Sequence, residues 1–591
     1  MPFTLLAVSA LVAVPLVLAA IFLAFRPWYP TLDLAMTELR VRDVGGRHTP
    51  LIGLPGRIGD FPDQGSHPGP WSFWLIRPFH LVSGGRSWGM ELGSALLNVA
   101  AATGSLWIAR RIGGRRVLLA VAGVLAVAVR GYGLSVLTHP WNPYFPLLLW
   151  IVVLLAAWAV LSGDHRMALV VVVVGTLAAQ THVPYLLLAI SMSALVIATL
   201  AVRRDVPTLL ASVGAAAFFW LPAGVDQLRR EPGNISMLID HFTGDTDEST
   251  IGYVQGSGVF LRHLDLPHAA FEMFRGNDAF LEVSGQTGGL PIGGLIVFVA
   301  WIAAVVVAVR RRHALLMHLD AVVAVALAVG WFSMTRIFGK IWFYLTLWAW
   351  GTALLVLVSI VWAALLVVRE RFDVERFAGR ARYAVGAAIL VPTMMSLVAA
   401  TTLQVPEENL SSGLGLVLDD TEQALRDSVG DSVGVDGRYV VFWQDSNFIG
   451  AQGYGLVNEL ERRGFEVGVH PTWRVPVTPQ RVFAEGTYDA EVHLVSGAYI
   501  EEWRARTGYV EVAMGDPRSP AEVAEFDRLR ARVIDRLLEL DRSDLADIVD
   551  VNLFGVSLDP DLPRDVVDDL SDMLVITAPV AVFIAPAGST S

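Results

Sequence analysis

Eleven long apolar runs dominate this sequence of 591 residues and fix the class of protein that it can form. A helix needs about 20 apolar residues to cross a bilayer, and the runs approach or reach that length. Only 17% of the residues are charged, whereas an ordinary soluble protein has roughly 25%. The sequence therefore predicts an α-helical polytopic membrane protein with about 11 transmembrane helices. The predicted spans lie near residues 4–25, 88–109, 117–137, 145–161, 167–181, 184–202, 206–224, 289–309, 315–334, 341–367 and 384–403.

Arginines in the short loops predict the orientation of these spans. They cluster after every second span, as at 110–116, 203–204, 310–312 and 369–382, and positively charged short loops stay in the cytoplasm. The first run lacks the basic residues and the cleavage site of a signal peptide, so we interpret it as a span. The N-terminus is then cytoplasmic. The loops expected outside are 26–87, 138–144, 225–288 and 335–340, together with the C-terminal segment.

Charge divides the chain into two predicted domains. Residues 406–591 carry 34 acidic and 15 basic side chains, a net charge of −19, and the rest of the chain carries a net +7. We therefore expect a transmembrane domain over 1–405, which includes the external loop 26–87, and a soluble extracytoplasmic domain over 406–591. The acidic domain lacks the basic surface that binds nucleic acid. The chain has no cysteine, which excludes disulfides, thiol nucleophiles and zinc–thiolate sites.

The C-terminal domain alternates between strand and helix patterns, which predicts an α/β domain with a parallel-type sheet. Its glycines at 450, 453 and 455 do not spell a dinucleotide-binding fingerprint, so we expect no nucleotide site. The predicted strands are 438–443, 465–469, 491–495 and 580–586, and the predicted helices are 448–463 and 520–542.

Carboxylates directly after the first span are the strongest functional candidates. Asp33 lies among apolar neighbours at the exit of the span, and Glu38 and Asp43 follow at intervals of five residues. A carboxylate can act as a general base or bind a hard divalent cation. The alternative is an ordinary charged surface helix, in which Glu38 pairs with Arg42 and Asp43 with Arg40.

Other polar residues mark the predicted outer ends of spans. His67, His139, Asn142 and His182 are candidates for substrate binding, with interfacial anchoring or helix capping as the alternative. Arg130 lies in the third span near its outer end. Arg336 and Lys340, the single lysine of the chain, would share one helical face. These three cations are candidates for binding a lipid phosphate, and snorkelling to headgroups is the alternative for Arg336 and Lys340.

This layout resembles the GT-C superfamily of integral-membrane glycosyltransferases, whose hallmark is an acidic residue in the first external loop. Asp33 matches that residue, with Glu38 as the second acid. An Asp-Asp or Asp-Glu doublet, common in other members, is absent. The segments 38–45, 66–70 and 141–144 resemble actinobacterial members of this type.

The resemblance implies a function. The donor would be a sugar on a polyprenyl phosphate, and the acceptor a cell-envelope glycan, lipid or protein. Asp33 would deprotonate the acceptor hydroxyl, which attacks the anomeric carbon in one step. Arg336, Lys340 and Arg130 would stabilise the departing phosphate. Asp33 and Glu38 could also hold Mg²⁺ or Mn²⁺, although the mechanism does not require a metal.

Two alternatives come from other functional classes. A transporter or flippase of lipid-linked sugars would use similar phosphate contacts without a base, and would be expected to show internal repeats or broken helices at mid-membrane. A non-catalytic scaffold of the cell envelope would bind wall polymer through the C-terminal domain. Sugar transfer from a purified donor separates these functions.

Overall fold

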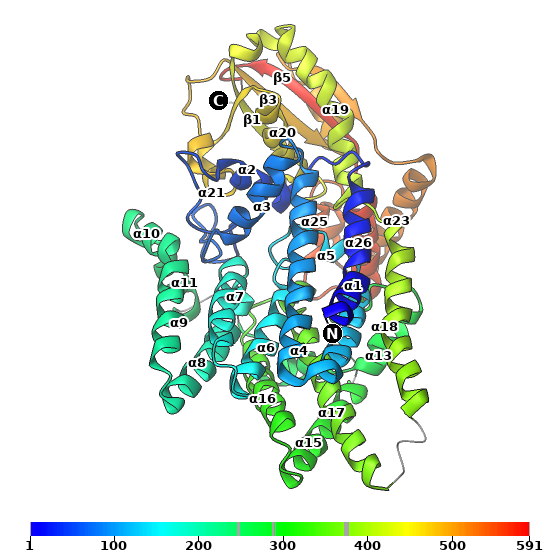
Figure 1. Cartoon of the computed structure of the whole chain (residues 1–591). Coiled ribbons are helices and arrows are strands. Elements are labelled where there is room, and N and C mark those ends of the chain that lie inside the picture. Colours follow the sequence, from blue (N-terminus) through cyan, green and yellow to red (C-terminus); the bar gives the residue numbers. More distant parts are fainter. Residues whose placement is uncertain (1, 245–248, 287–288, 290, 372–377, 590–591) are drawn as a thin grey trace. The chain divides into compact units, whose positions relative to one another are not determined.

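The computed structural model describes residues 2–244, 249–286, 289, 291–371 and 378–589 (Figure 1). Residues 372–377 of the predicted basic loop 369–382 lie outside this described part. The chain forms two compact units. The helical unit comprises Met1–Phe25, Pro50–Ile58 and Gly65–Leu403, and the α/β unit comprises Arg26–Thr49, Gly59–Gln64 and Gln404–Ser591. The loop 26–87, which we expected to belong wholly to the transmembrane domain, is thus divided between the two units.

The helical unit confirms the predicted class of a polytopic membrane protein. Seven of its described helices are long and apolar enough to cross a membrane, or eight if the bent pair α9 and α10 forms one span. The helices of this unit are α1 (Pro2–Leu23), α3 (Trp71–Val82), α4 (Trp88–Tyr132), α5 (Leu134–Leu137), α6 (Leu147–Leu161), α7 (Met167–Thr181), α8 (Leu186–Arg203), α9 (Val206–Phe219), α10 (Leu221–Arg229), α11 (Asn234–Thr243), α12 (Gly252–Arg262), α13 (Leu266–Phe274), α14 (Ala279–Gly285), α15 (Ile292–Arg310), α16 (Ala314–Thr335), α17 (Ala349–Arg371) and α18 (Ala378–Ala400), with short 3₁₀ turns at Val183–Tyr185 and Phe343–Leu345.

Three features account for the difference from the 11 predicted spans. Helix α4 takes up two predicted spans in 45 residues. The non-helical torsions of Gly113 and Gly114 break this helix at the boundary between the two spans. Helices α6 and α7 have 15 residues each, less than the roughly 20 that a bilayer requires. The predicted span 206–224 is bent by 45° between α9 and α10.

The α/β unit contains a mixed sheet of five strands in the order β2-β1-β3-β5-β4. Strand β1 runs parallel to β2 and β3, whereas β5 is antiparallel to both β3 and β4. The sheet is therefore parallel at β2-β1-β3, as the predicted parallel-type sheet requires, and antiparallel at β5. Its strands are β1 (Arg438–Gln444), β2 (Glu466–Val469), β3 (Ala490–Ser496), β4 (Val510–Gly515) and β5 (Val580–Pro586).

The helices of the α/β unit come from both ends of the chain. Helix α2 (Leu32–Asp43), from the loop after α1, packs against α20 (Ala451–Arg462). Leu529, Val533 and Leu537 of α23 (Pro520–Glu539) lie at helical spacing and are buried with Leu570 and Met573 of α26 (Arg564–Ile576). The remaining helices are α19 (Glu408–Arg426), α21 (Arg474–Val477), α22 (Tyr499–Arg504), α24 (Ser543–Ala546) and α25 (Leu553–Ser557), with 3₁₀ turns at Val429–Asp431, Gly434–Asp436, Pro471–Trp473 and Pro479–Arg481.

Candidate functional site

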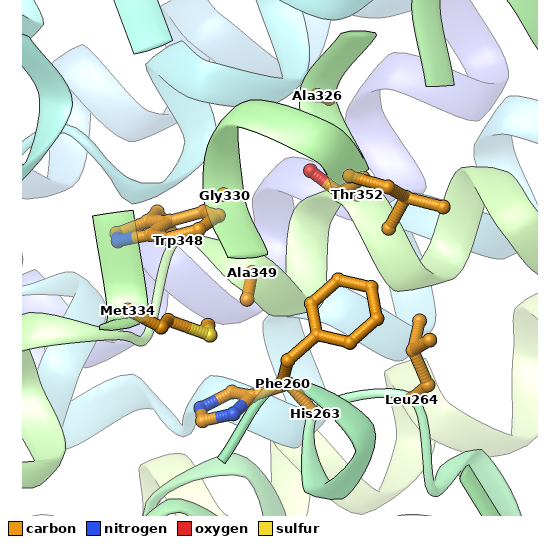
Figure 2. Close-up of a pocket in the computed structure, with 10 residues that line it drawn as sticks. Phe260, His263, Leu264, Ala326, Gly330, Met334, Trp348, Ala349 and Thr352 are labelled. Carbon is orange, nitrogen blue, oxygen red and sulfur yellow. The ribbon is translucent and has the colours of Figure 1, made fainter. Parts of the chain in front are cut away.

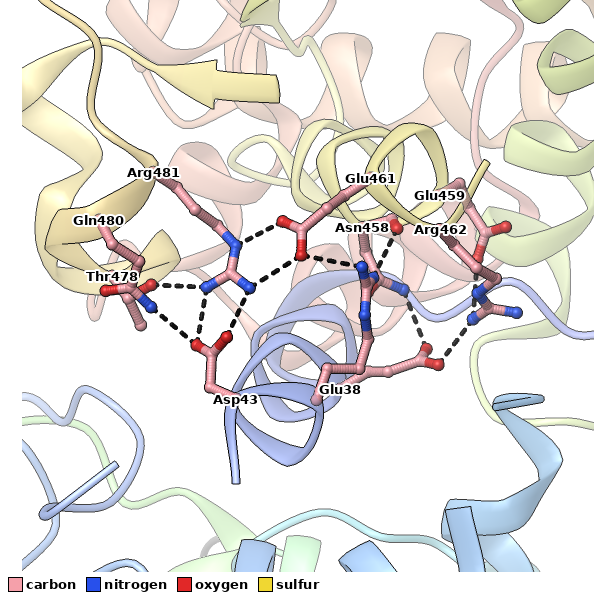
Figure 3. A network of polar contacts seen from close by, with 10 residues as sticks. Glu38, Asp43, Asn458, Glu459, Glu461, Arg462, Thr478, Gln480 and Arg481 are labelled. Atoms are coloured by element: carbon pink, nitrogen blue, oxygen red, sulfur yellow. Dashed lines mark hydrogen bonds and ion pairs between the residues drawn. The ribbon is translucent and has the colours of Figure 1, made fainter. Parts of the chain in front are cut away.

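Helix α2 carries three of the acidic residues that the sequence analysis singled out, and it is buried instead of forming a charged surface helix. Residues 34–41 of the helix are all buried. The predicted pairs within the helix are wrong, because Arg42 bonds to Glu461 and Arg40 donates to the carbonyls of Val475 and Pro476. The charges of α2 therefore serve to attach it to the rest of the α/β unit (Figure 3).

Glu38 lies in the middle of this contact and is 0% exposed. One carboxylate oxygen accepts a hydrogen bond from Asn458 Nδ2 at 2.9 Å, and the other accepts one from Arg462 at 2.7 Å (Figure 3). A buried carboxylate with both oxygens engaged is stabilised in place as an anion. These contacts favour a structural role for Glu38 over the predicted role of second catalytic acid.

Asp43 ends the helix with a second, stronger anchor. Its carboxylate receives two hydrogen bonds from the Arg481 guanidinium, at 2.8 and 2.9 Å, and one from Gln480 at 2.7 Å. Arg481 also bonds to Glu461, at 2.6 Å. Paired bonds from one guanidinium fix both the distance and the orientation of a carboxylate. Asp43 is thus an attachment point, as Glu38 is.

Asp33 has a different environment in the first turn of the same helix. It is half-buried, and it follows Leu32, whose φ is +43°. The residues just before it bond to the start of the C-terminal segment. Thr31 donates to Glu407, Tyr29 N donates to Ser411 Oγ at 2.8 Å, and Trp28 Nε1 donates to the Pro406 carbonyl at 3.2 Å. Strained backbone of this kind concentrates at functional positions.

Glu407 is the carboxyl that the sequence did not reveal. Burial and, to a smaller extent, the negative charge of Asp33 together raise its pKa to about 8. Glu407 also has a positive φ, of +52°. When two carboxyl groups lie close together, the charge of the first to ionise raises the pKa of the other.

Raising the pH from about 6 to about 9 is expected to lower the free energy of unfolding of the α/β unit. Burial raises the folded-state pKa of Glu407 to about 8 and that of Glu459 to about 7, so the folded unit holds protons that the unfolded chain has already released. Each such proton is worth up to about 1.4 kcal/mol per pH unit. The stabilisation is complete at a pH below the pKa that each glutamate has in the unfolded chain. It is lost as the pH rises through the pKa that the same glutamate has in the folded unit. Thermal unfolding measured against pH should show the decline, and Glu407→Gln should reduce it; an unchanged slope in that variant would contradict the assignment.

The possible metal pair of Asp33 and Glu38 does not fit this geometry. Both oxygens of Glu38 are already engaged by Asn458 and Arg462. In the part of the chain that the structure describes, no group of three or more histidine, aspartate and glutamate side chains is placed to hold a metal ion.

In the helical unit, three of the predicted substrate-binding histidines meet in one cluster. The ring centroids of His67 and His182 are 5.2 Å apart, and His67 Nδ1 accepts a bond from Val183 N at 3.2 Å. Tyr344 contacts His182, with centroids 6.3 Å apart, and Trp141, at 4.9 Å. We define the histidine–aromatic cluster as His67, His139, Trp141, Tyr144, His182, Tyr185 and Tyr344; His139 joins it through Trp141 and Tyr144.

The members of this cluster come from four separate connections of the helical unit: 65–70, 138–146, 182–185 and 336–348. Asn142 is buried in the second of these connections. The contacts therefore place these connections at one end of the helical unit, as the alternation of the predicted spans requires. The connection that follows α10 lies at the same end, because Asn234 exchanges two hydrogen bonds with the backbone of Ser66.

The imidazoles of the cluster are neutral. Burial lowers the pKa of His67 to about 4 and that of His139 to about 3, and it also lowers the pKa of His182. Nδ1 of His139, Nδ1 of His182 and the hydroxyl of Tyr185 have no hydrogen-bond partner among the described residues. Buried polar atoms normally have partners, so these three atoms are the unsatisfied polar groups of the cluster.

The predicted phosphate-binding cations do not lie on one helical face. Helix α16 ends at Thr335 and α17 begins at Ala349, so Arg336 and Lys340 lie in the connection between them. The expectation that the two residues share one helical face is therefore wrong. Lys340 Nζ lies 4.8 Å from the ring centroid of Trp342. Desolvation lowers the pKa of Lys340, and the positive charge of Arg57 lowers it further. The sequence analysis missed Arg57, a second cation whose charge acts on Lys340; we call these two residues the cation pair.

Arg130 is committed elsewhere. Its guanidinium donates to the carbonyls of Asn277, at 3.0 Å, and Met273, at 3.2 Å, and lies 3.6 Å from Asp278. These contacts tie α4 to the segment between α13 and α14, and they give Arg130 a structural role.

An enclosed cavity elsewhere in the helical unit is too small to be a substrate site. It holds about 10 Å³, room for roughly one water, and it lies between the end of α12, α16 and the start of α17 (Figure 2). His263 is its ionisable lining residue, and both its ring nitrogens are already within hydrogen-bond distance of Val259 O, at 2.8 Å, and Ser284 Oγ, at 3.1 Å.

Comparison with known proteins supports the fold. No protein-family model and no curated protein sequence matches this chain. Among solved structures it is similar to ArnT from Cupriavidus metallidurans bound to undecaprenyl phosphate, with a TM-score of 0.50 and 14% identity over 86% of this chain and 96% of that one. The chain has a GT-C-like fold. A crystal structure of the Archaeoglobus fulgidus oligosaccharyltransferase, in complex with Zn and sulfate, matches with a TM-score of 0.44 and 11% identity over 98% of this chain and 88% of that one.

Proposed function

We propose that this chain is a membrane glycosyltransferase that moves a sugar from a polyprenyl-phosphate donor to an extracytoplasmic glycan, lipid or protein acceptor. The observation that carries the proposal is the fold shared with ArnT, which was crystallised with undecaprenyl phosphate. The short arginine-rich loops support an external location for the α/β unit. The segments 38–45, 66–70 and 141–144 support an actinobacterial type.

The helical unit supplies groups suited to the donor. Arg57 and Lys340, with exposed Arg336 at the end of α16, would bind the phosphate through charge-assisted hydrogen bonds. Two like charges held close together favour an anion between them. The neutral imidazoles of His67, His139 and His182, together with Asn142, would bind the sugar. We leave Arg130 out of this set because its guanidinium already pairs with Asp278.

The α/β unit supplies the proposed base, Asp33. Its carboxylate would take the proton of an acceptor hydroxyl while the hydroxyl oxygen bonds to the anomeric carbon of the donor. The bond from that carbon to the phosphate oxygen breaks in the same step, and the polyprenyl phosphate leaves with the electron pair. Cations at the phosphate stabilise this developing charge.

A transfer assay tests the function directly. The purified full chain in nanodiscs would be given a radiolabelled polyprenyl-phosphate sugar and a mixed cell-envelope acceptor fraction. Covalent label in the acceptor supports a transferase. Movement of the donor across a liposome membrane without transfer would identify a flippase instead, and neither activity would identify a scaffold.

We expect Arg57→Ala and Lys340→Ala each to weaken the binding of farnesyl phosphate by about 1.5–3 kcal/mol, the range for hydrogen bonds to charged groups. This corresponds to a loss of affinity of roughly 10- to 150-fold. Isothermal titration of the full chain measures the loss. Arg229→Ala removes an exposed arginine at the end of α10 and is the matched control. Equal affinity in all three variants would exclude the cation pair as the phosphate site.

A further inference from the structure

Four aromatic side chains of the α/β unit are in contact; Phe61, Trp443 and Trp473 reach solvent, and Tyr454 is buried beneath them. We define them as the aromatic surface: Phe61, Trp443, Tyr454 and Trp473. Ring centroids are 5.2 Å apart between Phe61 and Trp473, 4.8 Å between Trp473 and Trp443, and 4.9 Å between Trp443 and Tyr454. Phe61 is 54% exposed, and both tryptophans are half-buried. A surface cluster of large rings is costly to leave in water and marks a binding position.

The aromatic surface lies where α/β sheets bind ligands. Trp443 is the penultimate residue of β1, and Trp473 follows the end of β2, which runs parallel to β1. Ligands of open α/β sheets bind beyond the carboxyl ends of such parallel strands. The neighbouring loop is built around Asp445, which accepts hydrogen bonds from Gly450 N and from Ser496 Oγ at the end of β3.

Two glycines fix the position of the Trp443 ring. A Cβ at Gly450 would lie 2.1 Å from Trp443 Nε1, and one at Gly453 would lie 2.5 Å from the ring carbon Cδ2. The indole therefore lies directly against the backbone at the start of α20. A ring held by backbone loses little freedom on binding a ligand, which favours affinity. These glycines, which form no nucleotide fingerprint, position an aromatic ring.

The loop after α2 completes the aromatic surface. Residues 59–64 of this loop belong to the α/β unit and carry Phe61. Asp63 forms an ion pair with Arg474, directly after Trp473. This ion pair ties the loop to the turn that carries Trp473 and holds the Phe61 ring beside the indole.

The aromatic surface also lies close to Asp33. Helix α20, which carries Tyr454, packs against α2, which carries Asp33. A Cβ at Gly455, the residue after Tyr454, would lie 2.7 Å from the Pro30 carbonyl oxygen and 3.5 Å from Thr31 Cγ2, so the segment just before Asp33 lies against the backbone of α20. The proposed base and the aromatic surface thus belong to one part of the same unit.

We propose that the aromatic surface binds a neutral oligosaccharide and that this oligosaccharide is the acceptor. The C–H face of a sugar ring carries partial positive charge, which the negative face of an aromatic ring attracts. The four side chains carry no charge, and the acidic C-terminal segment, with a net −19 over 406–591, disfavours polyanions such as nucleic acid or acidic polysaccharide. The identity of the oligosaccharide as acceptor rests on the proposed function.

A binding experiment on the full chain in nanodiscs tests this proposal. Maltohexaose, cellohexaose, mannohexaose and arabinohexaose are titrated separately, with saturation-transfer NMR and tryptophan fluorescence as readouts. We expect at least one hexasaccharide to bind, and Trp473→Ala or Phe61→Ala to weaken that binding by about tenfold. Trp473→Phe and Phe61→Tyr keep a ring at each position and should retain it. Tyr509→Ala, a half-buried aromatic residue directly before β4 at the opposite edge of the sheet, is the matched control. A hexagalacturonate should bind more weakly than the neutral sugars.

The outcomes separate this inference from the proposed function. Binding that survives in both alanine variants overturns the inference, as does the absence of binding by any neutral hexasaccharide while transfer proceeds. Alanine variants that change only vesicle association or self-association would identify the aromatic surface as a lipid or self contact, and would also overturn it. Oligosaccharide binding without sugar transfer in any assay would support the aromatic surface and overturn the transferase.

Discussion

Replacing Asp33 by asparagine is expected to reduce sugar transfer by at least about 100-fold, and by up to about 10,000-fold, the range that a general base contributes. Asparagine has nearly the size and polarity of aspartate but cannot take a proton from an acceptor hydroxyl. The Asp33 side chain is half-buried, and its negative charge acts on the nearby Glu407 and Tyr454. Transfer of labelled sugar by the purified full chain, at saturating donor, measures the loss as a fall in kcat.

Two controls make the Asp33 result specific. Glu485→Gln neutralises an exposed carboxylate of the same unit and should leave transfer unchanged. The thermal unfolding of Asp33→Asn is measured beside the wild type, so that transfer is compared per folded molecule. Transfer by Asp33→Asn at a rate close to the wild type would remove Asp33 as the base, and Glu407 would become the next carboxyl to replace.

The fold was predictable where a single local pattern decides the structure. Apolar runs produced helices throughout the helical unit, and the strands β1 and β5 match their predicted ranges closely because their residues are apolar and β-branched. Strand β4 was missed because it is an edge strand with alternating exposure and an irregular register between Glu511 and Ala513. The direction of β5 was not predictable either, since strand patterns carry no information about the partner's direction.

The candidate site was predictable only in part, for a related reason. The alternation of spans alone predicts that His67, His139 and His182 lie on the same side of the membrane, because each belongs to a connection on the predicted outer side. Glu407 and Arg57 could not be predicted, since neither lies in a distinctive local pattern and their significance comes from neighbours distant in sequence. The pairing of Glu38 was misjudged because helical spacing offered Arg42, whereas the packing of α2 on α20 supplied Arg462 and Asn458 instead.

Glu38→Ala is expected to lower the free energy of unfolding of the α/β unit by about 3 kcal/mol, the lower end of the cost of breaking a buried ion pair. The substitution removes the acceptor of the fully buried Asn458 amide and one of the two carboxylates that pair with Arg462, the other being Glu459. Thermal unfolding of the full chain in nanodiscs measures the loss, and the exposed Glu485→Ala variant should lose less than about 0.5 kcal/mol.

A double-mutant cycle decides whether Glu38 acts through its partner. Glu38→Ala with Arg462→Ala removes both charges, so the combined loss should be smaller than the sum of the single losses by about 1 kcal/mol or more. Glu38→Gln keeps an acceptor for Asn458. Because the role of Glu38 is to attach α2, and with it Asp33, to α20, this variant should retain most transfer per folded molecule. If Glu38→Gln remained as stable as the wild type yet lost transfer as completely as Asp33→Asn, Glu38 would be a catalytic residue, and its two hydrogen bonds would position it for the reaction instead of serving only to hold the helix.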